Sequence, residues 1–300
     1  MNSVMTKGHS LVKFTWYKLI KYKLLKKMSD KRFIELDYLI NTKNALNLTD
    51  PKTFNEKLQW LKLNNRKTYY TTLVDKYEVR EYISELIGEE YLIPLLGVYD
   101  TYDDIDFRAL PDQFVMKPTH TSGNIFICKD KNQIDHEALR GKIDAWLSRD
   151  YYSVHREWPY KNVNPRIIIE EYIEQESGSE LRDYRFFCFD GAPKFITVDF
   201  NIIDKSKTRR NLYDVGWNIM DATISYPQEK ELVIEKPEKL EQLIELSCML
   251  SKDIPHARID FYYINNKIKF GEITFFHQSG MGDIQPDEFN IEMGNWITVV

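Results

Sequence analysis

The sequence predicts an α+β protein in which a helical N-terminal region precedes two sheet-containing lobes. The first observation is a change of pattern near residue 75, where helix-start signals give way to short apolar runs separated by turns. The second is a pair of hairpin signals, because Asp190-Gly191 and Asn265-Asn266 each stand between two apolar runs. The third is composition: 43% hydrophobic and 29% charged residues in a 300-residue chain suit a folded core.

We divide the chain into four segments. Residues 1–33 form a basic amphipathic arm, residues 34–74 a helical region, residues 75–173 the first lobe, and residues 174–300 the second lobe. In the helical region, Thr53 and Glu56 have the spacing of a helix cap followed by an early acid. The first lobe is expected to hold a helix near 76–86, strands at 93–98, 114–117 and 125–128, a helix near 135–147, and a strand at 166–172.

The second lobe is expected to begin with a hairpin of residues 184–189 and 194–200. A polar loop rich in Lys and Arg is predicted over residues 201–211. A helix near 237–252 then leads into a final hairpin of residues 257–264 and 268–275.

The net charge of −5 conceals a basic arm. Residues 1–33 carry eight lysines and one arginine against one aspartate, so the rest of the chain carries about −13. An acidic body argues against a nucleic-acid partner. Lysines alternate with aliphatic and aromatic residues in the arm, so residues 7–32 suit an anionic membrane surface. Packing of the arm on its own acidic body is the alternative.

Cysteine usage and hydropathy bear on the compartment. Cys128, Cys188 and Cys248 form no disulfide framework or zinc pattern, which favours a reducing environment. The arm lacks the continuous apolar stretch of a secretory signal, and no apolar run approaches the ~20 residues of a transmembrane helix. We therefore expect a cytoplasmic protein, peripheral on the inner face of the membrane if the arm binds lipid.

Lys117 and the loop that follows it are a candidate phosphate site. The strand-like Phe114–Pro118 is followed by the small polar loop Thr119–Asn124. Backbone N–H groups in such a loop can cradle a phosphate that the lysine neutralises. The loop has one glycine and its lysine comes first, unlike a P-loop, and an ordinary strand–turn–strand is the alternative.

Asp260 and Glu272 are a candidate magnesium pair. The turn at Asn265-Asn266 places them near opposite points of two paired strands, and Mg²⁺ is usually held by carboxylates together with substrate phosphates. Arg258 shares a strand face with Asp260, where a cation can stabilise developing negative charge. The alternatives are one carboxylate that points to solvent and a simple ion pair between Arg258 and Asp260.

Taken in order, these pieces resemble the ATP-grasp superfamily, to which D-alanine–D-alanine ligase belongs. The pieces are Asp75-Lys76, Lys117-Pro118 with Ser122-Gly123, Glu170-Glu171-Tyr172-Ile173, Arg258-Ile259-Asp260 and Glu272-Ile273-Thr274, spread over residues 75–282. Within the superfamily the chain looks most like the TupA-like branch, which is linked to teichuronopeptide and capsular polysaccharide biosynthesis. That branch has signatures similar to DKYEVR at 75–80, KPTH at 117–120 and FGEITF at 270–275.

The resemblance implies two α+β lobes that clasp ATP, with separate groups for the phosphates and the nucleoside. Lys76 and Lys117 would contact the phosphates, and a loop over them would act as a lid. The lid residues would be Thr121, Ser122 and Gly123. The adenine hinge would be formed by Glu170 and the backbone of Glu171, Tyr172 and Ile173, with Glu180 or Glu176 on the ribose.

The resemblance also implies the reacting centre. Asp260 and Glu272 would hold Mg²⁺, and Arg258, with the backbone near Gly280, would steady a tetrahedral intermediate. The candidates for a cation at the γ-phosphate are Arg209 and Arg210, with Arg185 and Lys194 as alternatives. Superfamily members usually have Asn where this chain has Thr274, which leaves open whether one or two Mg²⁺ ions bind.

By this resemblance, the expected activity is ATP-dependent amide formation through an acylphosphate. The acceptor would be a uronic acid in a glycan or nucleotide-sugar precursor of a surface polysaccharide, and its partner an amino acid or amine. Aromatic residues between 146 and 160 could stack on sugar faces, with core packing as the alternative. Two other interpretations are a glycosyltransferase of the same pathway and a non-catalytic ATP-binding scaffold at the membrane.

Overall fold

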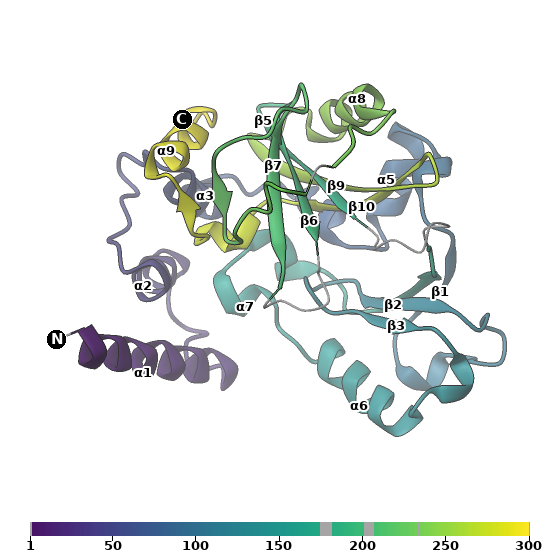
Figure 1. Ribbon diagram of the computed structural model, residues 1–300. Helices are drawn as coiled ribbons and strands as arrows, with labels where there is room; N and C mark the ends of the chain where they lie inside the picture. The colour runs from purple at the N-terminus through teal and green to yellow at the C-terminus, as the bar shows by residue number, and fades with distance from the viewer. Residues whose placement is uncertain (1, 175–181, 201–206, 233, 300) are drawn as a thin grey trace.

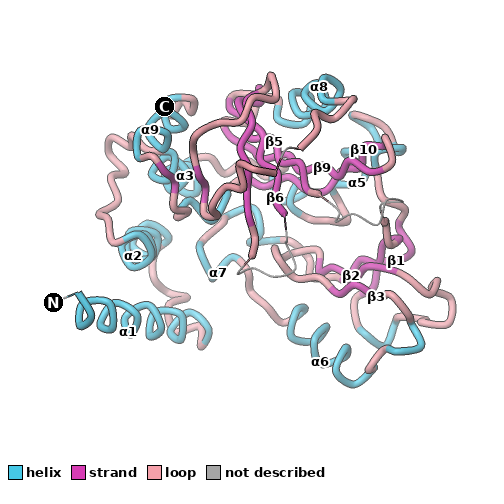
Figure 2. Tube along the Cα trace, viewed as in Figure 1, coloured by secondary structure: helices cyan, strands magenta, loops and turns pink. Residues whose placement is uncertain are grey.

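The computed structural model describes residues 2–174, 182–200, 207–232 and 234–299. Its first three helices, α1 (Asn2–Lys21), α2 (Asp30–Thr42) and α3 (Phe54–Asn64), lie to one side of the sheets (Figure 2). Thr53 and Glu56 form a reciprocal capping box at the start of α3, where each side chain accepts a backbone N–H of the other residue. Within the described ranges, every helix is too short or too polar to cross a bilayer.

The first lobe is built on a four-stranded antiparallel sheet. Helices α4 (Tyr70–Val74) and α5 (Val79–Leu86) lead into it, and the strand order is β1 (Leu95–Tyr99), β4 (Ile167–Glu171), β2 (Phe114–Pro118), β3 (Phe126–Cys128). Helix α6 (His136–Leu147) packs its apolar face on this sheet, since Leu139, Ile143 and Trp146 share a core with Phe114 and Ile167. The short helix α7 (Tyr152–His155) and the 3₁₀ helix η4 (Trp158–Asn162) return the chain to β4.

The second lobe is built on a five-stranded antiparallel sheet. Its strand order is β10 (Lys267–Thr274), β9 (His256–Ile264), β5 (Asp183–Phe189), β6 (Ala192–Phe200), β7 (Arg209–Asp214), and α8 (Leu240–Ser251) packs against it. Both predicted hairpin turns are present, and their central residues have positive φ: Asp190 46° and Gly191 82°, Asn265 49° and Asn266 61°. A small sheet of β8 (Thr223–Ile224) and β11 (Ile284–Gln285) precedes the last helix, α9 (Asp287–Asn295).

The two main sheets lie one above the other, with the second lobe uppermost in Figure 1. Tyr262 of β9 interacts electrostatically with Lys117 of β2 and Glu170 of β4, so these strands of the two lobes face one another. The predicted α+β architecture, with two lobes after a helical N-terminal region, is confirmed.

One local prediction is wrong. The polar loop expected over 201–211 ends earlier, because Arg209 and Arg210 begin strand β7. Arg210 is only 1% exposed and lies opposite Asp199 in the sheet, so its charge is neutralised inside the lobe. A buried arginine paired in this way gives a polar sequence to a largely buried edge strand. Residues 201–206 lie outside the described residues.

Candidate active site

Asp260 and Glu272 lie directly opposite one another on β9 and β10. A β-bulge between Phe270 and Glu272 shifts the register by one residue and brings Glu272 opposite Asp260. Opposed residues of an antiparallel pair project from the same face, so the two carboxylates lie together. Gly271 occupies the bulge, where a Cβ atom would lie 3.0 Å from the Asp260 carbonyl oxygen. The bulge and its glycine therefore create the carboxylate pair.

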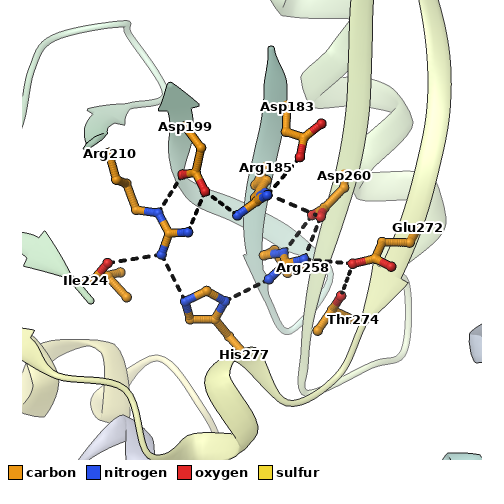
Figure 3. A network of polar contacts seen from close by, with 10 residues as sticks. All are labelled: Asp183, Arg185, Asp199, Arg210, Ile224, Arg258, Asp260, Glu272, Thr274 and His277. Atoms are coloured by element: carbon orange, nitrogen blue, oxygen red, sulfur yellow. Dashed lines mark hydrogen bonds and ion pairs between the residues drawn. The ribbon is translucent and has the colours of Figure 1, made fainter. Parts of the chain in front are cut away.

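Arg258 bridges these two carboxylates (Figure 3). Its Nε and Nη2 donate to the two oxygens of Asp260 at 2.7 and 2.5 Å, and Nη2 also lies 3.0 Å from Glu272 Oε1. The hydroxyl of Thr274 donates to the same Glu272 oxygen at 3.1 Å. Arg258 is thus held beside the metal candidates and also makes the simple ion pair that the sequence left as an alternative.

Two further arginines extend the network across the sheet. Arg185 Nη1 lies 2.6 Å from Asp199 Oδ2, and Nη2 lies 2.8 Å from Asp183 Oδ2. Arg185 Nε is 3.6 Å from Asp260 Oδ2. Arg210 binds both oxygens of Asp199, at 2.6 and 2.7 Å. Side chains of all five strands of this sheet therefore form one continuous set of ion pairs (Figure 3).

His277 lies between Arg258 and Arg210. Burial, followed by the charges of Arg258, Arg210 and Arg185, holds the pKa of His277 well below its usual 6.5. Arg258 Nη1 lies 2.8 Å from Nδ1 of this ring and Arg210 Nη1 lies 3.3 Å from Nε2. A neutral imidazole has one acceptor nitrogen, and the shorter distance assigns it to Nδ1. His277 therefore orients Arg258 without adding charge.

Burial disfavours the charged form of both carboxylates, and nearby cations oppose this effect. Burial raises the pKa of Asp260 to about 6, although Arg258 and Arg185 oppose this rise. Burial also opposes ionisation of Glu272, but Lys76, Arg258 and Arg185 outweigh it and lower the pKa of that group. The influence of Lys76 on Glu272 shows that charges of both lobes meet in one site.

On the first lobe, Glu170 lies between two cations. Lys117 Nζ is 2.9 Å from Glu170 Oε2, and Arg80 Nη1 is 3.0 Å from Oε1. Burial disfavours the charged form of Lys117, but Glu170 and other negative groups nearby raise its pKa above the usual value. The Glu170 carboxylate is therefore paired with Lys117. An adenine base would contact this carboxylate only at the edge of the ion pair.

Lys76 and the loop Thr121–Asn124 are joined to each other. Lys76 Nζ donates to the Thr121 carbonyl at 2.5 Å, and burial lowers the pKa of this lysine while Glu272 opposes the change. Thr121 is 1% exposed, whereas Ser122 and Gly123 are exposed at the tip. Gly123 has φ 76°, and no other atom lies within 4 Å of where its Cβ would be. A loop anchored at one end and open at its tip suits a lid.

The predicted hinge lies at the end of β4. Glu171 is exposed and its N–H donates to the Pro94 carbonyl at 3.0 Å, while Tyr172 and Ile173 are half-buried. Glu180 and Glu176, the predicted ribose contacts, lie outside the described residues.

Two predicted cations do not join the site. Arg209 projects from the opposite face of β7 to Arg210, and its guanidinium donates to the adjacent Thr208 carbonyl at 3.1 Å. Lys194 is exposed near the turn of the β5–β6 hairpin, roughly 17 Å of strand away from Asp199.

The structure does bring together eight of the other predicted residues: Lys76, Lys117, Glu170, Arg185, Arg210, Arg258, Asp260 and Glu272.

Sequence reasoning missed Arg80, Asp183, Asp199 and His277. Signals for three of them exist. Asp183 and Arg185 alternate on one strand face, Asp199 is the only acid in the apolar run 195–200, and Arg80 follows Lys76 by four residues. His277 had no such signal, because it reaches the arginines from the irregular segment η5 (His277–Gly280).

A tyrosine pair borders the reacting centre. The rings of Tyr151 and Tyr160 meet edge to face with centroids 4.7 Å apart. Burial, followed by electrostatic interactions with Tyr151, Glu157 and Glu272, raises the pKa of Tyr160 well above 10, and Arg258 opposes the rise. Tyr160 therefore lies near the Arg258–Glu272 pair. By contrast, Trp146 and Tyr152 are largely buried, which matches the core alternative for those two residues.

The carboxylate pair fits a divalent cation that is completed by substrate oxygens. In the described part of the chain, the contacts of Glu272 are made by Oε1, which leaves Oε2 for a cation. No group of three or more His, Cys, Asp or Glu side chains that could hold a metal is found among the described residues. Two protein carboxylates plus phosphate oxygens are a usual magnesium set, whereas a site of protein ligands alone would need more donors.

The chain matches one protein-family model and is similar to several solved structures. A family model described as TupA-like ATPgrasp matches residues 56–298. No curated protein sequence gives a significant match. Among solved structures, the chain is similar to D-alanine–D-alanine ligase from Bacillus anthracis complexed with ATP, at 18% identity and a TM-score of 0.40, covering 68% of this chain and 54% of that one. It is also similar to L-amino acid ligase from Bacillus licheniformis, at 14% identity and a TM-score of 0.45, covering 75% of this chain and 49% of that one. The chain thus spans about half the length of these two enzymes.

Proposed function

Because the chain belongs to the TupA-like ATP-grasp family, we propose that it is an ATP-dependent carboxylate–amine ligase. Its acceptor would be the carboxylate of a uronic acid in a surface-polysaccharide precursor, and its second substrate an amino acid or another amine. The observation that carries the proposal is the meeting of Lys76 and Lys117 from one lobe with Arg258, Asp260 and Glu272 from the other. Such a set binds and neutralises phosphates.

The proposed chemistry matches this distribution of charge. A carboxylate oxygen attacks the γ-phosphorus of ATP, the bond to the β,γ-bridging oxygen breaks, and ADP leaves. The amine nitrogen then attacks the acylphosphate carbon, phosphate leaves with the bonding pair, and the amine loses a proton. Both steps require that anions be held close and neutralised, which is work for lysine and arginine side chains.

Individual residues have distinct tasks in this proposal. Lys117, held by Glu170, and Lys76, held at the base of the lid loop, would bind phosphate oxygens. Asp260 and Glu272 would hold Mg²⁺, and the bound cation would supply positive charge against the phosphates. Arg258 would then be released from part of its carboxylate contacts and would stabilise the oxyanion that forms on the acceptor carbon.

Two tyrosines near Arg258 are compatible with a sugar acid as the acceptor. Tyr151 and Tyr160 lie near the reacting centre, and tyrosine is a residue type on which sugars can stack. Arg258 stands beside them and would meet the acceptor carboxylate. The family's link to capsular polysaccharide biosynthesis is the reason that we name a uronic acid.

The test is a substrate screen with the purified chain. ADP and phosphate should appear only when Mg²⁺, ATP, a uronic acid or its nucleotide-sugar and an amine are all present, and mass spectrometry should find the amide. Asp260→Asn and Glu272→Gln should lose turnover, while Asp221→Asn, which alters an exposed carboxylate outside the site, should retain it.

ATP binding without ADP formation over a broad screen would favour a non-catalytic scaffold. A thermal shift with UDP-sugars but not ATP would favour a glycosyltransferase.

A further inference from the structure

Helix α1 is attached to the body by one face only. Trp16 and Ile20 on that face are 6% and 8% exposed and pack with Phe33 of α2. The indole Nε1 of Trp16 donates to Asp37 Oδ1 at 2.8 Å, and the Tyr17 hydroxyl donates to Asn41 Oδ1 at 3.1 Å. One face of the arm, which we call the inner face, is therefore packed on the body, as one of the two sequence-based alternatives predicts.

The opposite face of the arm carries exposed apolar side chains. Leu11, Phe14, Lys18 and Tyr22 follow one another at intervals of three and four residues, which places them on one stripe. Leu11 is 65% exposed, Phe14 57% and Tyr22 65%. Leu24, in the turn after the helix, is 68% exposed. We call this set the outer face. Helix α1 itself lies at one edge of the molecule, to the side of the two sheets (Figure 1).

Cations accompany the outer face. Lys18 Nζ lies 4.4 Å from the centroid of the Phe14 ring. Exposed lysines continue through the turn after α1, at positions 21, 23, 26 and 27. Among the described residues, the ion pair that involves these lysines is Lys26–Asp150, at 4.0 Å between an exposed lysine and a partly buried aspartate. Most of the positive charge of the arm therefore faces solvent next to exposed aromatic and aliphatic side chains.

We propose that the outer face docks on an anionic lipid surface while the inner face keeps the arm on the body. Aliphatic and aromatic side chains can enter the headgroup region of a bilayer, and neighbouring lysines can reach lipid phosphates because their stems are long and apolar. The complementarity is specific to an anionic surface, since the arm is strongly basic and the rest of the chain is acidic. This inference does not depend on the proposed reaction.

The arrangement would also orient the enzyme. Arg156 donates to the Leu25 carbonyl at 3.0 Å, and His155 Nδ1 lies 2.7 Å from Asp37 Oδ2, so the arm is tied through α2 and α7 to the segment that carries the tyrosine pair. An arm bound to lipid would thus hold the tyrosine pair, and the site beside it, at a defined distance from the lipid surface.

The test is vesicle flotation with the full chain at physiological ionic strength. The chain should float with vesicles that contain phosphatidylglycerol and not with phosphatidylcholine alone, and added salt should weaken binding. The variant Leu11→Ser/Phe14→Ser/Tyr22→Ser should bind at least about tenfold more weakly. Lys18→Gln/Lys21→Gln/Lys23→Gln should lose the difference between the two lipids.

The matched control is Ile219→Ser/Ile291→Ser, which removes two exposed apolar side chains elsewhere and should bind as the parent does. Circular dichroism and thermal unfolding should match in all variants. Equal flotation of the outer-face variant, or no flotation of the parent chain, would overturn the proposal. So would a concentration-dependent dimer that the outer-face variant abolishes, since a second copy would then cover this face.

Discussion

Lys62 of α3 donates from Nζ to the main-chain carbonyl of Ser279 at 2.8 Å, although the two residues are 217 positions apart. Lys62 is 1% exposed and also donates to Gln59 Oε1 at 3.0 Å and the His155 carbonyl at 3.1 Å. The Gln59 amide donates to the carbonyls of Ser279 and Gly280 at 2.8 Å each. The N-terminal helical region therefore binds, through these hydrogen bonds, the segment that directly follows His277.

These hydrogen bonds hold a segment whose backbone conformation is unfavourable. Gln278, Ser279 and Gly280 have φ values of 49°, 53° and 66°, and two consecutive non-glycine residues in the left-handed region are costly. Two of the carbonyls of this segment point at α3 and are bound there. We infer that α3 positions His277, and through it Arg258, from outside the two lobes.

Replacing Lys62 by Met should destabilise the chain. The substitution leaves Gln59 Oε1 and the His155 carbonyl without this donor, and each such buried group costs about 1–3 kcal/mol. Urea unfolding should report the loss. Activity should show a lower kcat with little change in the KM for ATP, because Lys62 contacts the loop beside Arg258. An unchanged unfolding midpoint together with an unchanged kcat would contradict the role.

The same residue gives a pH prediction. Burial lowers the pKa of Lys62 to about 8, while Glu157 and Asp37 oppose the shift. A lysine with a lowered native pKa binds fewer protons in the folded state than in the unfolded state between the two pKa values. Its unfavourable contribution to stability is therefore full below pH 8 and fades as pH rises toward the unfolded value of about 10.4. The stability of the parent relative to Lys62→Met should rise over that window.

Asp199 should be among the most costly carboxylates to remove. It is 3% exposed and lies between Arg185 and Arg210, and Arg210 itself is 1% exposed. In Asp199→Ala two buried guanidinium groups lose their main counter-charge, which should cost about 3–5 kcal/mol. Chemical denaturation would measure it. The matched control is Asp221→Ala, whose ion pair with Lys230 is largely exposed and should contribute less than about 1 kcal/mol.

The sequence predicted what depends on local pattern. Hairpin turns, the capping box at Thr53 and the amphipathic helix α6 all follow from spacing over a few residues, and each appears where expected. The pairing of Asp260 with Glu272 could be predicted because a single turn connects their strands. In contrast, the Asp199–Arg210 pair, the His277 bridge and the Lys62 contact join distant segments. No periodicity reports such contacts, so a buried arginine was mistaken for a loop residue.

His256 should make the protein sensitive to acid. Burial lowers the pKa of His256 to about 3, its Nδ1 donates to the Cys188 carbonyl at 2.9 Å, and the ring contacts Phe54 and Phe189. The unfolded chain binds a proton near pH 6.5 and the folded chain does not, so stability is full above 6.5 and falls below it. At pH 5 the loss should be about 2 kcal/mol relative to pH 8.

Thermal or urea unfolding from pH 8 to pH 5 measures this loss. His256→Leu should be less stable at pH 8 but should show a flatter pH dependence than the parent. His136→Gln, which alters the exposed start of α6, should keep the parent slope. Parallel curves for the parent and His256→Leu would assign the acid sensitivity to other groups.

Gly271 should be needed for cation binding more than for folding. Its missing side chain allows the bulge that sets Glu272 opposite Asp260, and a Cβ atom would meet the Asp260 carbonyl at 3.0 Å. Gly271→Ala should push β10 away from β9 at this point and separate the carboxylates. The expected result is a higher KM for Mg·ATP, or weaker Mg²⁺-dependent ATP binding in calorimetry, at a modest loss of stability. Gly141→Ala is the matched control: its site in α6 has no atom within 4 Å of a new Cβ, so the change should stabilise the chain by about 0.5–1 kcal/mol and leave Mg·ATP binding unaltered.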